Sequence, residues 1–260
     1  MFDLASLESA LAETIFASKL HFSSITDSTN TDALVAARGG AAHGSVYFAD
    51  EQRAGRGRGG HAWHSVAGEG LYVTVLLRPR IPTACLPLLP LAAGLAAADA
   101  VEVTSGLNVD LRWPNDLLIG PRKAGGILVE AHSEDSAVGF AVVGIGINVH
   151  QSRFDPGLST PATSLDLEAG RRIPRQLLLV SLLKSLQRET AALEDGAMEK
   201  TVADRVKLAS TWVCGRSVEV HGPQACVGVT AGLDRNGFLL VQTDTGVVTV
   251  QTGGIRAAGI

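Results

Sequence analysis

The chain has 260 residues, of which 46% are hydrophobic and 18% are charged, and its formal net charge is −4. This composition excludes a disordered chain, and the length predicts one large domain or a medium-sized domain with a small appendage. The mild acidity argues against a general nucleic-acid-binding protein, which would need a basic surface. The three cysteines, Cys85, Cys214 and Cys226, are far apart, so we expect free thiols in a reducing compartment.

Neither a secretory signal nor a membrane span is predicted. The N-terminal stretch carries Asp3, Glu8 and Glu13 before any basic residue, which is the wrong sign for a signal peptide. The longest uncharged run, residues 81–98, contains three prolines and is rich in alanine, which favours a buried helix. We therefore expect a soluble, cytoplasmic protein.

Residues 1–212 alternate between helical and strand patterns. Apolar spacing predicts a helix over 4–19, a strand over 21–25 and, behind the cap residues 27–30, a helix over 32–38. The remaining helices are predicted over 86–103, 174–193 and 198–209, and the remaining strands over 45–49, 70–77, 109–112, 125–132 and 138–145. These segments predict a mixed α/β fold in which one sheet is flanked by helices.

The pattern changes after Trp212 to short strands separated by turn residues. Strands are predicted over 217–220, 226–233, 238–242 and 247–251. Their number and spacing favour a small β-barrel of roughly 45 residues, close to the lower limit for an independent core. We therefore divide the chain into a larger domain, 1–212, and a small β-domain, 213–260.

A glycine- and arginine-rich loop is expected before the strand over 70–77. Four glycines and three arginines occur within the eight positions from Arg53 to Gly60, and Trp63 follows. Glycines let the backbone approach a ligand closely, and arginines donate N–H groups to phosphate or carboxylate. A single copy between two strands favours a ligand-binding loop over an RGG-like RNA contact. The loop matches neither a Walker A motif nor a convincing dinucleotide fingerprint.

The segment Arg112-Trp113-Pro114-Asn115-Asp116 follows a predicted strand. By itself, Asn115-Asp116 is best explained as an ordinary turn. However, Lys123 follows seven residues after Asp116, and a hairpin would bring the two side chains toward one sheet edge. A lysine beside a carboxylate can neutralise phosphate charge, with the carboxylate acting as a base or metal partner.

Gly144 and Gly146 alternate with isoleucines in a strand pattern that ends at Asn148. Alternating glycines indicate either tight sheet packing or close approach to a ligand, and the pattern does not distinguish these. Asn148, between two apolar residues, favours a ligand contact.

Ser28, Thr29 and Asn30 follow Asp27 directly. They are typical helix-capping residues. Their hydroxyl and amide groups could in addition bind a polar ligand head such as a urea.

Together, these segments resemble the biotin protein ligases. The resemblance covers nearly the whole chain and rests on segments that occur in a specific order: 27–30 (DSTN), Gln52 with 55–58 (GRGR) and Trp63, 113–116 (WPND), Lys123 with 126–130 (GILVE), and 144–148 (GIGIN). It implies a catalytic domain akin to class II aminoacyl-tRNA synthetases, a mixed α/β sheet with flanking helices, followed by a small SH3-like barrel.

The resemblance also implies a reaction. The family uses ATP to activate biotin as biotinyl-5′-AMP, releases pyrophosphate, and transfers biotin to one lysine of a biotin carboxyl carrier protein. Biotin and ATP would be the substrates and Mg²⁺ the cofactor, while the protein ligands of the metal stay unassigned.

Roles for individual residues follow from the same resemblance. Biotin would be bound by Ser28, Thr29, Asn30, Gln52, Gly55, Arg56, Gly57, Arg58, Lys123 and Gly126. ATP or the adenylate would be bound by Arg56, Arg58, Trp63, Asn115, Asp116, Lys123 and Asn148. The implied catalytic residues are Lys123, Arg56, Arg58 and Asp116. Lys123 would offset negative charge at the α-phosphate, and Asp116 would assist the metal or the acceptor lysine.

The chain departs from the family pattern at three places. Gly59 and His61 stand where many relatives have arginine, so the loop is less basic. Ala258 stands near the position of the usual tail arginine, for which Arg256 is a possible substitute. The matched segments begin at residue 27 with no helix-turn-helix region before them, so we expect a ligase that is not a DNA-binding repressor.

Two other functions stay open at the level of sequence. A lipoate or octanoate ligase would share the fold and a similar adenylate, although the polar set of Ser28 to Asn30 with Gln52 favours a ureido head. A nucleic-acid-binding module is disfavoured by the acidic net charge. We expect no nucleic-acid or membrane partner, and either a monomer or a weak homodimer.

Overall fold

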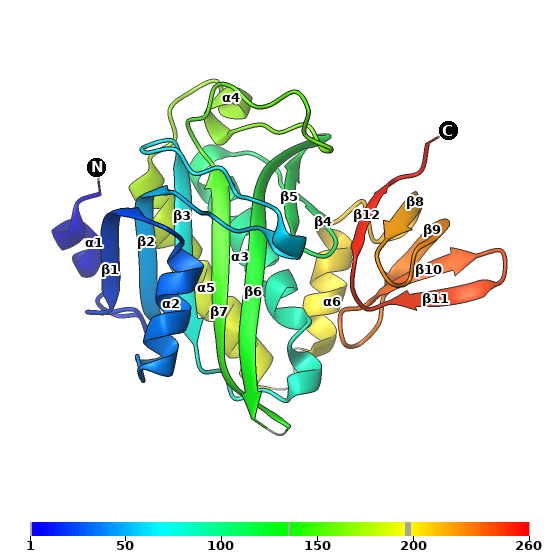
Figure 1. The fold of residues 1–260 in the computed structure, drawn as a ribbon, viewed down its shortest axis with the longest axis horizontal. Coiled ribbons are helices and arrows are strands. Elements are labelled where there is room, and N and C mark those ends of the chain that lie inside the picture. The colour runs from blue at the N-terminus through cyan, green and yellow to red at the C-terminus, as the bar shows by residue number, and fades with distance from the viewer. Residues whose placement is uncertain (1, 135, 196–198, 260) are drawn as a thin grey trace.

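The computed structural model describes residues 2–134, 136–195 and 199–259. They form two sheets, a large one with flanking helices and a small one at the C-terminal end (Figure 1). The mixed α/β fold with a separate C-terminal β-unit, predicted from sequence, is confirmed. The boundary between residues 212 and 213 stays a prediction, although it falls between the last helix and the first strand of the small sheet.

The large sheet has seven strands in the order β1-β2-β3-β7-β6-β5-β4. Strands β1 and β2 pair in parallel, and the other neighbours pair antiparallel. The strands are β1 Leu20–Thr26, β2 Ser45–Gln52, β3 Gly70–Leu77, β4 Asp110–Arg112, β5 Asp116–Ile119, β6 Arg122–Glu134 and β7 Ala137–Asn148. Every residue of β3 is buried, because helices or loops cover both faces at the centre of the sheet.

Helices cover the two faces of this sheet unequally. The helices are α1 Leu4–Ala10, α2 Thr29–Arg38, α3 Leu88–Ser105, α4 Leu165–Ala169, α5 Arg175–Glu194 and α6 Glu199–Leu208, with 3-10 turns at Arg58–Gly60 and Thr83–Cys85. In Figure 1, α3 and α5 lie behind the sheet, where the main core forms. Helix α2 and the loop between β2 and β3 lie in front, and this loop crosses β7 and β6.

Helix α3 contains most of the uncharged run noted in the sequence, namely residues 88–98. Within the described part of the chain it is the one helix long and apolar enough to cross a membrane, by length and composition. Its 18-residue window is 67% buried inside the protein, against the sheet and α5. The helix is therefore explained by core packing, as expected from its alanine content.

Three elements of the larger domain differ from the sequence-based expectations. The helix predicted over 4–19 ends at Ala10, because residues 11–18 form turns in which the Thr14 hydroxyl donates to the carbonyl of Leu11 at 2.6 Å. Strand β5 and helix α4 escaped prediction because segments of four or five residues carry little periodic signal. Residue 198, where a helix was predicted to begin, lies outside the described residues; α6 is described from Glu199.

The small sheet has five antiparallel strands in the order β11-β10-β9-β8-β12. They are β8 Cys214–His221, β9 Cys226–Leu233, β10 Leu239–Thr243, β11 Gly246–Val250 and β12 Gly254–Ala257. The last of these was not predicted. The β9–β10 turn docks on the large sheet, because the buried indole of Trp113 donates Nε1–H to the carbonyl of Gly237 at 3.0 Å. The small sheet is thus attached beside β4 and β5.

A pair of glycine substitutions tests the packing of α3. A Cβ at Gly94, inside the helix, would meet Leu111 and Ile127 at 3.5 and 3.6 Å, which is ordinary contact. We expect Gly94→Ala to raise the free energy of unfolding by about 0.5–1 kcal/mol, because glycine is costly within a helix. Gly106 ends α3 at φ +77°, so Gly106→Ala is expected to lower it by about 1–2 kcal/mol. Urea denaturation of both variants measures these changes. A change of the same sign in the free energy of unfolding of the two variants would contradict this account.

Candidate functional site

A row of directly paired residues runs across the front face of the large sheet. Arg112 pairs with Asp116, Asp116 with Gly126, Gly126 with Gly146, and Gly146 with Tyr72. Directly opposed residues of neighbouring strands point to the same face. The row therefore places an arginine and a carboxylate at one end, a tyrosine at the other, and a floor of two glycines between them.

The glycines of this face make room for side chains from other elements. A Cβ on Gly146 would lie 2.6 Å from the indole of Trp63, and one on Gly144 would overlap the Oδ1 of Asn30. Gly144 belongs to the next row, between Thr74 and Leu128. The alternating glycines therefore serve close approach at the site, which the sequence pattern alone left undecided.

Hydroxyl and amide groups form one end of the site. The Oε1 of Gln52 accepts from the Thr29 backbone N–H at 2.9 Å, and its Nε2 donates to Ser65 Oγ at 2.8 Å. The Thr74 hydroxyl donates to Asn30 Oδ1 at 2.6 Å and lies 2.8 Å from Thr29 Oγ1. Helix α2 begins at Thr29, so the buried side chains of Thr29 and Asn30 belong to its first turn. This end can bind a compact polar group through both donors and acceptors.

Lys123 and Asp116 form the opposite end. Lys123 Nζ lies 2.5 Å from Asp116 Oδ1, and the Arg112 guanidinium donates to Asp116 Oδ2 at 2.6 and 3.0 Å. A register shift between Leu117 and Leu118 interrupts the alternation of β6 ahead of Gly126. Because of this bulge, Lys123 shares the face of Gly126, where its Nζ would lie 3.5 Å from an added Cβ. The predicted proximity of Asp116 and Lys123 is confirmed.

The glycine–arginine loop crosses in front of β7 and β6 (Figure 1) and is held at two points. The Arg56 guanidinium donates to both carboxylate oxygens of Glu130, at 2.7 and 3.1 Å. The Arg58 guanidinium donates to the Gly253 carbonyl and, at 2.9 Å, to Thr252 Oγ1 of the small sheet's β11–β12 turn. Burial lowers the pKa of Arg58, and nearby Asp116 opposes this shift. The loop thereby connects the large sheet to the small one.

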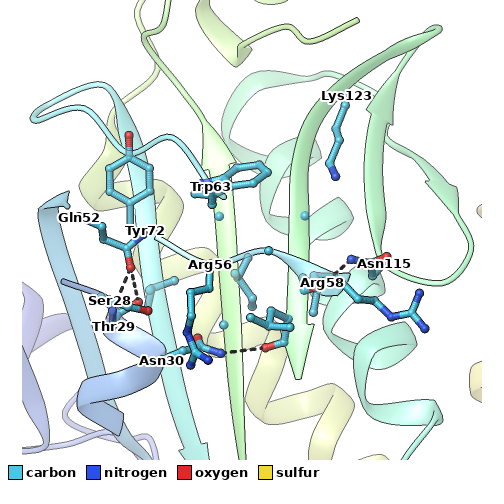
Figure 2. Close-up of a pocket in the computed structure, with 18 residues that line it drawn as sticks. Ser28, Thr29, Asn30, Gln52, Arg56, Arg58, Trp63, Tyr72, Asn115 and Lys123 are labelled. Carbon is cyan, nitrogen blue, oxygen red and sulfur yellow. Dashed lines mark hydrogen bonds between the residues drawn. The ribbon is translucent and has the colours of Figure 1, made fainter. Parts of the chain in front are cut away.

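These groups surround one pocket, which is open to solvent. Figure 2 shows the polar residues of α2 and Gln52 on one side, Lys123 on the other and Trp63 between them. Its lining includes most of the residues implied by the resemblance, namely Ser28, Thr29, Asn30, Gln52, Arg56, Gly57, Arg58, Trp63, Asn115, Lys123 and Gly126. Segments from residue 28 to residue 126 therefore converge on one cavity.

Three of the implied residues lie next to this lining. Gly55 lets the loop pack closely against Ser65, because an added Cβ would lie 2.9 Å from the Ser65 Oγ. Asp116 contacts the pocket through Lys123. Asn148 donates from Nδ2 to the Thr163 carbonyl at 3.0 Å, and its Oδ1 accepts from Gln151 at 3.3 Å. Asn148 thus anchors the segment that follows β7, and its role with ATP stays a prediction.

No role at the site is predicted from the sequence for Tyr72, Thr74, Leu128 or Glu130. Tyr72 and Leu128 line the pocket, while Thr74 and Glu130 hold Asn30. Burial raises the pKa of the Tyr72 phenol, which stays protonated and donates to the Val66 carbonyl at 3.1 Å. The sequence spacing could have indicated them, because residues two apart in a strand point to the same face of the sheet. Tyr72 and Thr74 are so spaced in β3, and Leu128 and Glu130 in β6.

Comparisons with known proteins agree with this geometry. Residues 22–148 match a family model described as the biotin/lipoate A/B protein ligase family. A biotin–[acetyl-CoA-carboxylase] ligase of Mycobacterium tuberculosis is 34% identical over 238 residues, which are 88% of this chain and 85% of the relative. The chain belongs to the biotin protein ligase family. It is accordingly an enzyme of the ligase class.

Further similarities extend over most of the ligase. A bifunctional ligase/repressor BirA of Bacillus subtilis (strain 168) is 32% identical over 244 residues, covering 91% of this chain and 73% of the relative. Among solved structures, the biotin protein ligase from Aquifex aeolicus in complex with biotin and ATP has a TM-score of 0.80 at 27% identity. That match covers 93% of this chain and 100% of the other. The relatives thus include both a ligase and a ligase/repressor.

Proposed function

We propose that this ligase activates biotin with ATP to form biotinyl-5′-AMP and then transfers the biotinyl group to a lysine of a biotin carboxyl carrier protein. The observation that carries the proposal is one pocket with a hydroxyl–amide end at Thr29, Asn30 and Gln52 and a cationic end at Lys123. A ureido ring matches the first end, and a carboxylate beside a phosphate matches the second. The Aquifex aeolicus relative, solved with biotin and ATP, supports both substrates.

In the first step, a carboxylate oxygen of biotin bonds to the α-phosphorus of ATP while the bond to the β-phosphate breaks and pyrophosphate leaves. Lys123 offsets the negative charge that builds between the two anionic reactants. Arg56 and Arg58 keep the loop closed over the pocket, and Trp63 covers the glycine floor and packs near the adenine. Exclusion of water by this loop protects the adenylate from hydrolysis.

In the second step, the lysine amine of the carrier attacks the biotinyl carbonyl and AMP leaves. That amine is mostly protonated at neutral pH, so a carboxylate near Lys123 is a suitable proton acceptor. Asp116 takes this role once Lys123 turns to the phosphate, while Arg112 keeps its bonds to the other carboxylate oxygen. Asn115 assists near the ribose and phosphates, and its Nδ2 donates to the Ile127 carbonyl at 2.8 Å.

Magnesium fits this site as an ion carried by ATP. Within the described residues, no group of three or more His, Cys, Asp or Glu side chains could hold a metal ion by itself. Magnesium commonly keeps several waters and binds through substrate phosphates and one or two carboxylates. Asp116 would be the carboxylate that assists the ion, and the ion would neutralise the phosphate oxygens.

We infer a cytoplasmic enzyme whose protein partner is the carrier domain. The net charge of −4 and the engagement of Arg56 and Arg58 within the protein disfavour duplex DNA as a partner, so we expect no repressor function. A gel-shift assay tests this expectation, with operator DNA from the genome that encodes the ligase and with biotin and ATP present. A sequence-specific shift of the DNA would show that the chain has a repressor function.

The adenylating step is tested by ATP–pyrophosphate exchange with biotin, lipoate and octanoate side by side. We expect exchange with biotin, because lipoate and octanoate lack the ureido N–H and C=O groups that the hydroxyl–amide end can bind. Exchange only with lipoate or octanoate would assign the chain to the sister activity. Transfer is then measured as the increase in mass of a carrier domain upon biotinylation. A carrier domain whose acceptor lysine is replaced by arginine is the control and should show no increase.

A further inference from the structure

The carboxylate of Glu130 contacts two residues of the pocket lining, Asn30 and Arg56, but has no role in the reaction proposed above. Glu130 follows Gly126 and Leu128 on the front face of β6, and its side chain is 29% exposed. Its Oε2 accepts from Asn30 Nδ2 at 2.9 Å and from the Arg56 guanidinium at 2.7 Å. Its Oε1 accepts from the same guanidinium at 3.1 Å. One carboxylate therefore joins the polar end of the pocket to the loop that covers it.

These contacts define the orientation of the Asn30 amide. An ionised carboxylate only accepts hydrogen bonds, so the amide must present its NH₂ group to Glu130. That group also donates to the Leu128 carbonyl at 3.3 Å, which uses both of its hydrogens. The Oδ1 then faces Thr74 and Gly144, and it accepts one bond from the Thr74 hydroxyl. A carbonyl oxygen has two lone pairs, so one acceptor position remains for a ligand.

We infer that Glu130 is a positioning residue that holds Asn30 with its carbonyl toward the ligand and thereby selects an acid whose head group carries an N–H donor. A flipped amide would place Oδ1 against the carboxylate, where two acceptors repel each other. The same carboxylate pairs with Arg56 and so links Asn30 to the loop that covers the pocket. The inference rests on the proposed function, because the ureido ring of biotin supplies the N–H donor.

A double-mutant cycle read by calorimetric biotin binding tests the role of Glu130. The variants are Glu130→Gln, Asn30→Ala and the two combined. The glutamine is nearly isosteric but can donate to a flipped Asn30. We expect Glu130→Gln to weaken biotin binding about tenfold in the wild-type background and less than about twofold in the Asn30→Ala background. The KM for biotin is expected to rise while the KM for ATP stays unchanged.

Matched variants separate positioning from general damage. Glu102→Gln removes an exposed carboxylate from α3, behind the sheet, and is expected to bind biotin as the wild type does. Combining Asn30→Asp with Glu130→Gln reverses the bond between the side chains and again presents an acceptor to the ligand, so binding should recover relative to Glu130→Gln. Recovery of biotin binding in this pair supports the positioning role of Glu130 even if Glu130→Gln alone is poorly folded.

Each remaining outcome overturns a distinct statement. Additive losses in the cycle, no loss in Glu130→Gln, or no recovery in the reversed pair would overturn the positioning role while leaving the proposed function intact. Absence of biotin binding by the wild-type chain would overturn the proposed function, and this inference with it.

Discussion

Replacing Lys123 with alanine is expected to lower the rate of biotin-dependent ATP–pyrophosphate exchange by about 10²- to 10³-fold, because removing one group that stabilises transition-state charge has effects of this size. Lys123 is the cation on the glycine floor, and its Nζ lies 2.5 Å from Asp116. The fold should persist, because Asp116 keeps Arg112 at 2.6 Å. The backbone of Lys123 also keeps its bonds to Pro161 and Thr163.

The matched control for this variant is Lys184→Ala. Lys184 is exposed on α5, behind the sheet, so exchange should stay within twofold of the wild-type rate. Thermal unfolding of both variants, followed by circular dichroism, shows whether the folds are equal. Near-native exchange by Lys123→Ala would exclude the proposed role at the α-phosphate. A large fall in its melting temperature would instead attribute the loss of exchange activity to destabilisation of the fold.

Replacing Gly144 with alanine is expected to weaken biotin binding at least about 100-fold, as measured by calorimetry. The added methyl group would occupy the space of the Asn30 side chain, and a closely packed site does not rearrange to accept it without cost. The added Cβ would overlap Asn30 Oδ1 and lie 2.8 Å from its Cγ. Asn30 cannot yield easily, since Thr74, Leu128 and Glu130 hold its amide. The free energy of unfolding should fall by about 1–3 kcal/mol.

Two further variants show whether this overlap is the cause. Gly94→Ala adds the same methyl group where contacts are ordinary, and its biotin binding should be unchanged. Asn30→Ala removes the overlapping amide, so the pair Asn30→Ala and Gly144→Ala should regain stability without regaining biotin affinity. If the pair were less stable than Gly144→Ala, the overlap would not explain the loss.

The sequence predicts the longer elements well because their signals are local. Strand β3 begins at Gly70 and ends at Leu77, as predicted, and β9 has its predicted bounds of 226–233. The helix predicted over 174–193 is observed at Arg175–Glu194. In contrast, the apolar spacing of 4–19 indicated one long helix, whereas side-chain hydrogen bonds end the helix early, and periodicity does not report such bonds.

The site residues were recognised by the same kind of local signal. The four segments around Ser28, Arg56, Asn115 and Lys123 carry unusual combinations of glycine, hydroxyl, amide and cationic groups, and all four reach one pocket. Glu130 and Thr74 were not recognised, because a glutamate or threonine in a strand is ordinary until its partner is known. Both of them act through Asn30, which lies far away in the chain.

Composition, motif order and element type were therefore determined by the sequence itself, since each depends on neighbouring residues. The tertiary structure alone decided which faces meet. Plain alternation along β6 would place Lys123 and Gly126 on opposite faces, and the bulge opposite Leu117 and Leu118 brings them to the same one. The contact of Arg58 with Thr252 and Gly253 likewise exists only because the small sheet docks beside β4 and β5. These contacts join residues that are 124 to 195 positions apart in the chain.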